Sequence, residues 1–192
     1  AAAFLASKPM SLVFEQACTL PTVWSTTHVA LERAGQHAGL SIIVHAAAGG
    51  VGLKAVEYAH WLRVLTVGSA GRPHKQAQLR SIGVSRRCSS RDGAAFAAGV
   101  ARLLASHRLH AILNSLSLDM IAVSFASLGE GGAFEEIGKR GVWASARHVA
   151  SAPATAYCAI ALDADMAHDP RWVHGVLTRL SARVDAAAVS SL

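Results

Sequence analysis

The sequence contains little cysteine: three residues, an odd number, stand far apart at Cys18, Cys88 and Cys158. Their spacing matches no metal-ligand pattern and gives no disulfide framework, so we predict neither a metal site nor a disulfide-stapled secreted domain. A reduced, cytoplasmic environment fits this cysteine usage best. Ten histidines are scattered without an H-x-x-H or H-E-x-x-H spacing, which favours surface or incidental positions for most of them.

Long hydrophobic runs are also lacking. No apolar run approaches the roughly 18 residues that a membrane span needs, and nothing at the amino end resembles a signal peptide. Hydrophobic residues nevertheless make up 52% of the chain, and the mean hydropathy is +0.34. The 192 residues therefore contain ample material for the core of one good-sized domain, or one domain with an appendage, and we expect no membrane partner.

The chain is basic, with a formal charge of +6 and an isoelectric point near 9.8. Most positive residues are dispersed, and the densest cluster follows an expected second strand, at Arg80, Arg86, Arg87 and Arg91. In a dinucleotide-binding fold that region faces the adenosine end of the cofactor, so phosphate binding explains the cluster locally. We therefore do not expect nucleic acid as a partner.

Residues 40–52 organise the rest of the chain. The apolar run at Ile42, Ile43 and Val44 is too short for a helix, and a helix-period pattern starts at Val51. The glycine turn between them (residues 47–52) is a variant of G-x-G-x-x-G whose first glycine is replaced by Ala47. A strand, a tight glycine turn and a helix together present free backbone N–H groups to a phosphate. The alternative is a strand-to-helix turn that binds nothing.

Short apolar segments alternate with helix-period segments along the chain, which predicts an α/β fold of the Rossmann type with a doubly wound parallel sheet. Before residue 40 we expect a short helix capped by Ser11 and stopped by Pro21, then a helix over 22–34. Residues 142–155 are expected to form a loop with one helical turn. The expected strands are 41–46, 63–68, 86–88, 109–114, 131–137 and 157–162, and the expected later helices are 51–62, 73–82, 92–105, 118–127 and 170–184.

Several stretches resemble one family, the medium-chain enoyl reductase domains of modular polyketide synthases and animal-type fatty acid synthases. The matching stretches are Phe14-Glu-Gln-Ala-Cys-Thr-Leu-Pro21, Ile43-Val-His-Ala-Ala-Ala-Gly-Gly-Val-Gly52, Leu79-Arg-Ser-Ile-Gly83, Ser89-Ser-Arg-Asp92, Ile112-Leu-Asn-Ser-Leu116 and Gly131-Gly-Ala-Phe-Glu-Glu-Ile-Gly-Lys139. They occur in family order and at nearly family spacing. Ordered motifs of this kind are far more specific than one glycine turn.

The resemblance implies the nucleotide-binding half of such an enzyme, with a substrate-binding lobe expected before Ala1 and after Leu192. Residues 1–39 would be a helical lead-in to that lobe, 40–165 the NADPH-binding Rossmann domain, and 166–192 a C-terminal helix leading back. The implied partners are other domains of a megasynthase and an enoyl thioester carried by an acyl carrier protein. Chain length of the substrate, stereochemistry and oligomeric state stay open.

NADPH is the expected cofactor. The second strand ends at Ser69 without the acidic residue that usually binds the ribose of NAD, and Lys75 follows. A 2′-phosphate prefers donors and positive charge, and the resemblance places Ser69, Lys75 and Arg91 at phosphate-contacting positions. The other cofactor-binding positions implied by the family are Thr26, Ala48, Gly49, Gly50, Val51, Asn114 and Gly138. The alternative to a cofactor role is an ordinary structural one: Lys75 would be a solvated residue on a helix, and Asn114 a turn residue at the end of a strand.

Lys139 is the expected catalytic residue, because it follows an apolar strand at the edge where open α/β sheets bind ligands. Reduction of an enoyl thioester needs a proton at the α-carbon, which a lysine can supply. The resemblance implies Asp163 as its carboxylate partner, whereas the alternative makes Lys139 and Arg140 an ordinary basic loop. Departures at His28 and Val29, where the family often has aromatic residues, leave open a silent pseudo-domain or a quinone reductase.

Overall fold

The computed structural model describes residues 4–105, 107–117 and 119–192 and contains a six-stranded sheet in which every neighbouring pair is parallel. The strand order β3-β2-β1-β4-β5-β6 confirms the predicted Rossmann-type, doubly wound sheet. The strands are Ser41–Val44 (β1), Leu65–Ser69 (β2), Arg86–Cys88 (β3), Ala111–Asn114 (β4), Ala133–Glu136 (β5) and Ala156–Ala159 (β6).

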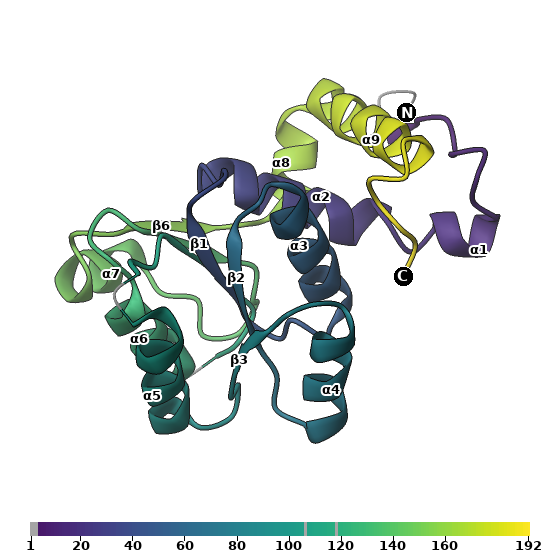
Figure 1. Cartoon of the computed structure of the whole chain (residues 1–192). Coiled ribbons are helices and arrows are strands. Elements are labelled where there is room, and N and C mark those ends of the chain that lie inside the picture. Colours follow the sequence, from purple (N-terminus) through teal and green to yellow (C-terminus); the bar gives the residue numbers. More distant parts are fainter. Residues whose placement is uncertain (1–3, 106, 118) are drawn as a thin grey trace.

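Helices separate the strands and cover both faces of the sheet (Figure 1). Pro21, Pro73 and Pro170 each stand in the first turn of a helix, where the missing N–H costs no hydrogen bond. Within the parts of the chain that the structure describes, no helix is long and apolar enough to cross a membrane. The helices are Phe14–Ala17 (α1), Pro21–Arg33 (α2), Gly50–Trp61 (α3), Pro73–Ser81 (α4), Gly93–Leu104 (α5), Asp119–Ser127 (α6), Ser145–Ser151 (α7), Leu162–His168 (α8) and Pro170–Asp185 (α9).

The core consists of two layers because successive strand residues point to opposite faces. Ile42 and Val44 of β1 pack with residues of α2, α3 and α4. Ile43 lies on the other face, in a cluster with residues of α5 and α6. All three side chains are buried. Helix α2, expected as part of a lead-in, thus belongs to the same core as β1.

Helix α3 approaches the end of β1 closely at Gly52. A Cβ atom at Gly52 would lie 2.5 Å from the carbonyl oxygen of Ala46 and 2.6 Å from the Cα of Ala47. Only glycine leaves room for the two backbones at this distance, as the glycine turn predicts. Ala46 adopts a positive φ of 47°, which is uncommon for a residue with a side chain.

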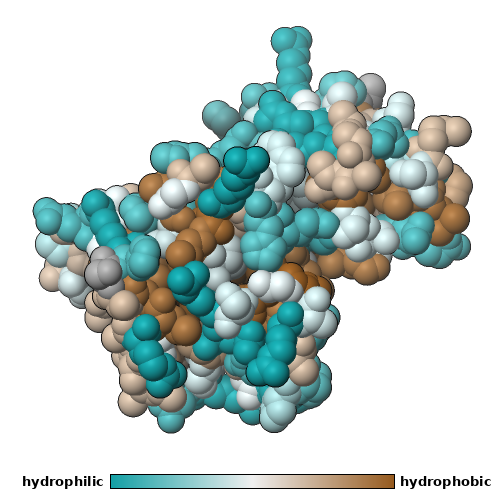
Figure 2. Space-filling view, viewed as in Figure 1, coloured by the Kyte–Doolittle hydropathy of each residue, from teal (hydrophilic) through white to brown (hydrophobic). Residues whose placement is uncertain are grey.

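A smaller lobe joins the two ends of the described chain. Helices α1 and α9 and the carboxyl-terminal end lie beside the sheet rather than over its faces (Figure 1). Hydrophobic residues gather on the surface of this lobe (Figure 2). Trp24 of α2 packs there with Val176 and Leu180 of α9. The guanidinium of Arg183 lies 4.7 Å from the ring of Tyr58 on α3, a cation–π contact that ties α9 to the Rossmann body.

Three local expectations were wrong, and a fourth was only partly right. Val13, not Ser11, caps α1, and Pro21 begins α2 instead of stopping the helix before it. The expected strand at 157–162 lies at Ala156–Ala159, because the chain turns into the unexpected helix α8 at Leu162. The expected loop over 142–155 holds helix α7, whose His148 packs against Phe125 and Tyr157.

Gly52→Ala is expected to lower the free energy of unfolding by about 1–3 kcal/mol, since the added methyl group overlaps the backbone of Ala46 and Ala47. Gly50→Ala is the matched control. A Cβ at Gly50 would touch only the side-chain ends of Val23 and Leu192, at 3.4 Å, so this variant should be neutral or slightly stabilising. Urea denaturation measures both. Equal effects of the two substitutions would contradict the close approach.

Candidate functional site

All six parallel strands end at one edge of the sheet, which we call the carboxyl edge. It carries the glycine turn after β1, the loop after β2, and the ends of β4 and β5 at Asn114 and Glu136. Ligands of open α/β sheets bind at this edge, where the strand order reverses. Here the order reverses between β1 and β4, which pair directly. Most of the predicted cofactor-binding residues therefore converge on one edge.

The N-terminus of α3 suits a phosphate. Gly49 is the N-cap residue and makes no side-chain capping bond, so the first amide groups of α3 have no side-chain acceptor. Ala48 is buried, and a Cβ at Gly49 would meet only the carbonyl oxygen of Ala46, at 3.3 Å. Gly50 and Val51 continue the turn into the helix. This donor set fits the pyrophosphate of a dinucleotide.

A buried hydrogen-bonded chain supports the glycine turn from beneath. The ring of His45, just after β1, lies 2.9 Å through Nδ1 from Ser69 Oγ and 2.8 Å through Nε2 from Ser124 Oγ. The Ala46 N–H donates to the same Ser69 oxygen, at 3.3 Å. His45 is thus neither a surface nor an incidental histidine, contrary to the sequence-based expectation for most histidines. The chain joins β1, β2 and α6 under the turn.

The directions of these hydrogen bonds follow from their neighbours. Ser124 donates its hydrogen to the carbonyl of Met120, so the Nε2 of His45 carries the proton and donates to Ser124. Burial lowers the pKa of His45 to about 3, so the ring is neutral and Nδ1 accepts from Ser69. The Ser69 side chain is fully buried. The prediction that its hydroxyl binds a cofactor phosphate is therefore not supported by its position.

The loop after β2 gathers positive charge. Lys75 stands in the first turn of α4, and the side chain of Arg91, from the loop after β3, lies against Gly71. A Cβ at Gly71 would approach Arg91 Nε to 2.5 Å. Two of the three predicted phosphate-contacting residues therefore flank the end of β2, where no acidic residue follows Ser69.

Asn114 and Gly138 are held by a residue that the sequence did not single out. Glu136, the last residue of β5, accepts from Asn114 Nδ2 through one oxygen and from the Gly138 N–H through the other, both at 2.6 Å. Asn114 gives its second amide hydrogen to the carbonyl of Leu116, at 2.8 Å. Asn114 is fully buried, so its amide offers no free N–H to a cofactor, and the predicted direct contact has no support from this geometry.

The remaining predicted residues lie at the same edge or beside it. Lys139 and Asp163 are exposed, and within the described residues no hydrogen bond or ion pair joins them. Their partnership stays a prediction. Thr26 lies in the middle of α2, and its hydroxyl donates to the Thr22 carbonyl, at 2.8 Å. Its neighbour Thr27 donates to the carbonyl of Val51, so α2 passes next to the start of α3.

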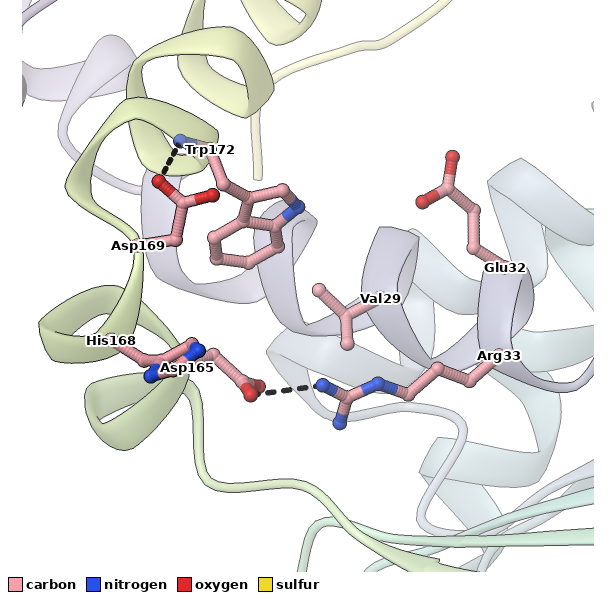
Figure 3. Close-up of a pocket in the computed structure, with 7 residues that line it drawn as sticks. All are labelled: Val29, Glu32, Arg33, Asp165, His168, Asp169 and Trp172. Atoms are coloured by element: carbon pink, nitrogen blue, oxygen red, sulfur yellow. Dashed lines mark hydrogen bonds and ion pairs between the residues drawn. The ribbon is translucent and has the colours of Figure 1, made fainter.

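A pocket of about 220 Å³ lies between α2 and the junction of α8 with α9 (Figure 3). Arg33 and Asp165, which both line the pocket, form an ion pair with 2.9 Å between Nη2 and Oδ1. The ring of Trp172 also lines it. None of the lining residues comes from the glycine turn or a strand end. Beside it, Arg33 also donates to Cys158 Sγ of β6, at 3.5 Å. This pocket is separate from the carboxyl edge.

Comparisons with known proteins decide the family. The chain is 35% identical over 138 residues to the highly reducing polyketide synthase ZEA2 of Gibberella zeae, covering 70% of this chain and 6% of that protein. It is 30% identical over 189 residues to the highly reducing polyketide synthase AN6791 of Emericella nidulans, covering 95% of this chain and 7% of that protein. No family model matches the chain.

Solved structures agree with these relatives. The CurK enoyl reductase superposes with a TM-score of 0.93 at 29% identity, covering 100% of this chain and 57% of that one. The nucleotide-binding subdomain of the enoylreductase domain of PpsC from Mycobacterium tuberculosis superposes with a TM-score of 0.78 at 24% identity, over 90% of this chain and 97% of that one. The chain belongs to the enoyl reductase domains of polyketide synthases. Its fold is that of their nucleotide-binding part.

Membership of this family confirms the resemblance read from the ordered motifs, and the relatives are polyketide synthases. The chain spans 6–7% of the length of these two curated relatives. Another neighbour, the CurF ER cyclopropanase, has a TM-score of 0.93 at 25% identity and covers 99% of this chain and 57% of that one. The fold alone therefore does not fix the reaction, and the residues at the carboxyl edge must support any assignment.

The buried carboxyl group of Glu135 should make the stability of the fold depend on pH. Its side chain is 4% exposed, and its Oε2 has no partner among the described residues. Burial raises its pKa to about 7, although the charge of Arg33 opposes this. The folded state therefore holds a proton that the unfolded state loses near pH 4.5. The resulting stability is present below pH 4.5 and is lost as the pH rises through 7.

Glu135→Gln should thus be more stable than the wild type at pH 8, by up to about 3 kcal/mol, and the difference should shrink towards pH 4.5. Urea denaturation across this range measures it. The comparison of the two proteins cancels the opposite contribution of His45, which stays in both. A difference that does not change with pH would refute the raised pKa of this buried carboxyl group.

Proposed function

We propose that the chain binds NADPH and forms the cofactor-binding part of an enoyl reductase. The reaction would reduce the carbon–carbon double bond of an enoyl thioester held on an acyl carrier protein, within a multidomain polyketide synthase. The observation that supports this most strongly is the uncapped N-terminus of α3 at the end of β1, in a chain of this family. Free amide groups and the positive end of a helix dipole attract a pyrophosphate.

The choice of NADPH over NADH rests on charge at the end of β2. Lys75 and Arg91 flank a loop that has no acidic residue to accept a ribose hydroxyl. A 2′-phosphate forms charge-assisted hydrogen bonds with such groups. The first turn of α4 would supply one of them, and the side chain of Arg91, lying on Gly71, the other.

Chemistry at the carboxyl edge would depend on Lys139. NADPH supplies the hydride for the β-carbon of the thioester, and the α-carbon needs a proton. Lys139 is exposed beside the end of β5, so its ammonium group can donate that proton or stabilise the charge of the enolate. Asp163, in the first turn of α8, would keep this ammonium group charged and oriented.

Two other functions share the cofactor site. A catalytically silent domain would bind NADPH for architecture alone, and a quinone reductase-like protein would pass the hydride to a quinone. Neither needs a proton donor at Lys139. Loss of enoyl reduction on removal of this lysine therefore separates the proposed function from both alternatives.

Arg91→Ala is expected to weaken NADPH binding roughly ten- to a hundredfold, the effect of one lost charge-assisted contact, and to leave NADH binding unchanged. The matched control is Arg80→Ala, which removes an exposed arginine from α4 and should alter neither. Isothermal titration calorimetry of the chain with both cofactors measures the change. Equal affinities of the wild type for NADPH and NADH would overturn the proposed cofactor preference.

Lys139→Ala is expected to lower kcat for a crotonyl-type thioester by roughly 10²–10⁴ if it acts as the proton donor, with NADPH affinity retained. The assay follows NADPH absorbance in the complete enoyl reductase region of the synthase. Arg140→Ala, which removes the neighbouring exposed cation, is the control and should keep kcat. A wild-type region that binds NADPH but reduces no enoyl thioester would instead support the silent domain.

A further inference from the structure

The ends of β4 and β5 meet through a single carboxylate. Asn114 and Glu136 are register partners and the last residues of their strands. The Glu136 carboxylate accepts one hydrogen bond from the Asn114 side chain and one from the backbone N–H of Gly138. Its exposed fraction is 1%. One buried side chain thus fastens two strand ends and the backbone that leads to Lys139.

The orientation of the Asn114 amide is fixed by this arrangement. Its Nδ2 gives one hydrogen to Glu136 and one to the carbonyl of Leu116, while its Oδ1 accepts from the Leu116 N–H, at 3.2 Å. A flipped amide would place oxygen against oxygen at the first two contacts. Both amide hydrogens and the carbonyl oxygen of Asn114 are therefore hydrogen-bonded, and Asn114 in turn holds the carboxylate in place.

The position of Gly138 depends on the same carboxylate. A Cβ atom at this residue would lie 2.6 Å from Glu136 Oε1. Only glycine lets its N–H reach that oxygen at hydrogen-bond distance, and Lys139 is the next residue. The orientation of the Ile137–Gly138 peptide, one residue before Lys139, is therefore set by Glu136.

We propose that Glu136 is a positioning residue: by holding the Asn114 amide and the Gly138 N–H at once, its carboxylate directs the backbone that carries Lys139. This inference rests on the proposed function, in which Lys139 delivers the proton. Glu136 itself is buried and does not reach the substrate. Its effect falls on the geometry of proton delivery, so it should act on kcat more than on NADPH binding.

The charge of Glu136 matters because both of its hydrogen bonds are charge-assisted only when it is ionised. Burial raises its pKa to about 7, against the effect of the bonds from Asn114 and Gly138. On the same face, burial raises the pKa of Tyr157 of β6, and the Glu136 carboxylate adds to this. Beyond Tyr157 lies His148 of α7, with ring centroids 5.4 Å apart.

As the pH rises through 7, ionisation of Glu136 should therefore strengthen the hydrogen bond that its carboxylate accepts from the Gly138 N–H. The Gly138 amide proton, hydrogen-bonded to a carboxylate, should resonate downfield in proton–nitrogen NMR spectra of the 192-residue chain. Its shift should follow an ionisation near pH 7. In Glu136→Gln the Gly138 resonance should move upfield and stop titrating. A glutamine side chain does not ionise, and its single carbonyl oxygen cannot replace the two carboxylate oxygens that accept from Asn114 and Gly138.

Glu135→Gln is the matched control. Glu135 is the adjacent residue of β5, is buried, and also has a pKa raised to about 7. It points to the opposite face, towards Arg33. This variant should leave both the Gly138 amide resonance and its titration unchanged. A shift of equal size in the two variants would refute a specific role for Glu136.

The kinetic arm uses the complete enoyl reductase region. Glu136→Gln is expected to lower kcat roughly ten- to a hundredfold, with the NADPH dissociation constant changed less than about threefold. The wild-type kcat should rise as Glu136 ionises through pH 7, and this rise should be absent from the variant. Combining it with Lys139→Ala should lower kcat little beyond Lys139→Ala alone, because both changes act on one step. Additive losses would contradict positioning through Lys139.

The titration of the wild type covers the case in which Glu136→Gln folds poorly. A wild-type Gly138 amide resonance that does not shift as the pH passes through 7 would refute a hydrogen bond from this N–H to an ionising Glu136. The NMR arm needs no catalysis, so an inactive wild type would refute the proposed reductase, while an unchanged Gly138 amide in Glu136→Gln would refute the positioning role.

Discussion

Contact between two backbones, at Gly52 of α3 and Ala46–Ala47 after β1, is the constraint on which the carboxyl edge depends. The helix can start directly under the strand end only because no side chain separates them. The left-handed conformation of Ala46 then turns the chain towards the helix, and the Ala46 N–H is satisfied by Ser69. A strained turn of this kind persists because its surroundings hold it from several sides.

The buried hydrogen-bonded side chains around His45 are one of the features that hold this turn. Ser69 stands at the end of β2, His45 at the end of β1, and Ser124 within α6. A neutral imidazole suits the position, because it donates through one nitrogen and accepts through the other. A protonated ring would have two donors, and the hydroxyl of Ser69 would have to turn away. Burial favours the neutral form of the ring.

The sequence alone predicted the features that depend on local pattern. Alternation of apolar strands and helices identified the parallel sheet, and the motif at Gly49–Gly52 identified the turn. Helix α8 was missed because its start at Leu162 follows an apolar stretch that continues the strand pattern. The hydrogen bonds of Glu136 and Ser69 could not be predicted, since they depend on partners 22 and 24 residues away in sequence. Two adjacent glutamates in a buried strand were the available indication of Glu136.

One consequence concerns how the sequence of this edge can change over evolution. The carboxylate oxygen of Glu136 fills the space that a Cβ at position 138 would need. An alanine at position 138 would push this oxygen aside and disturb its hydrogen bonds with Asn114 and with the residue 138 N–H. The same substitution should cost less once residue 136 is shorter. The two positions are therefore expected to change together over evolution.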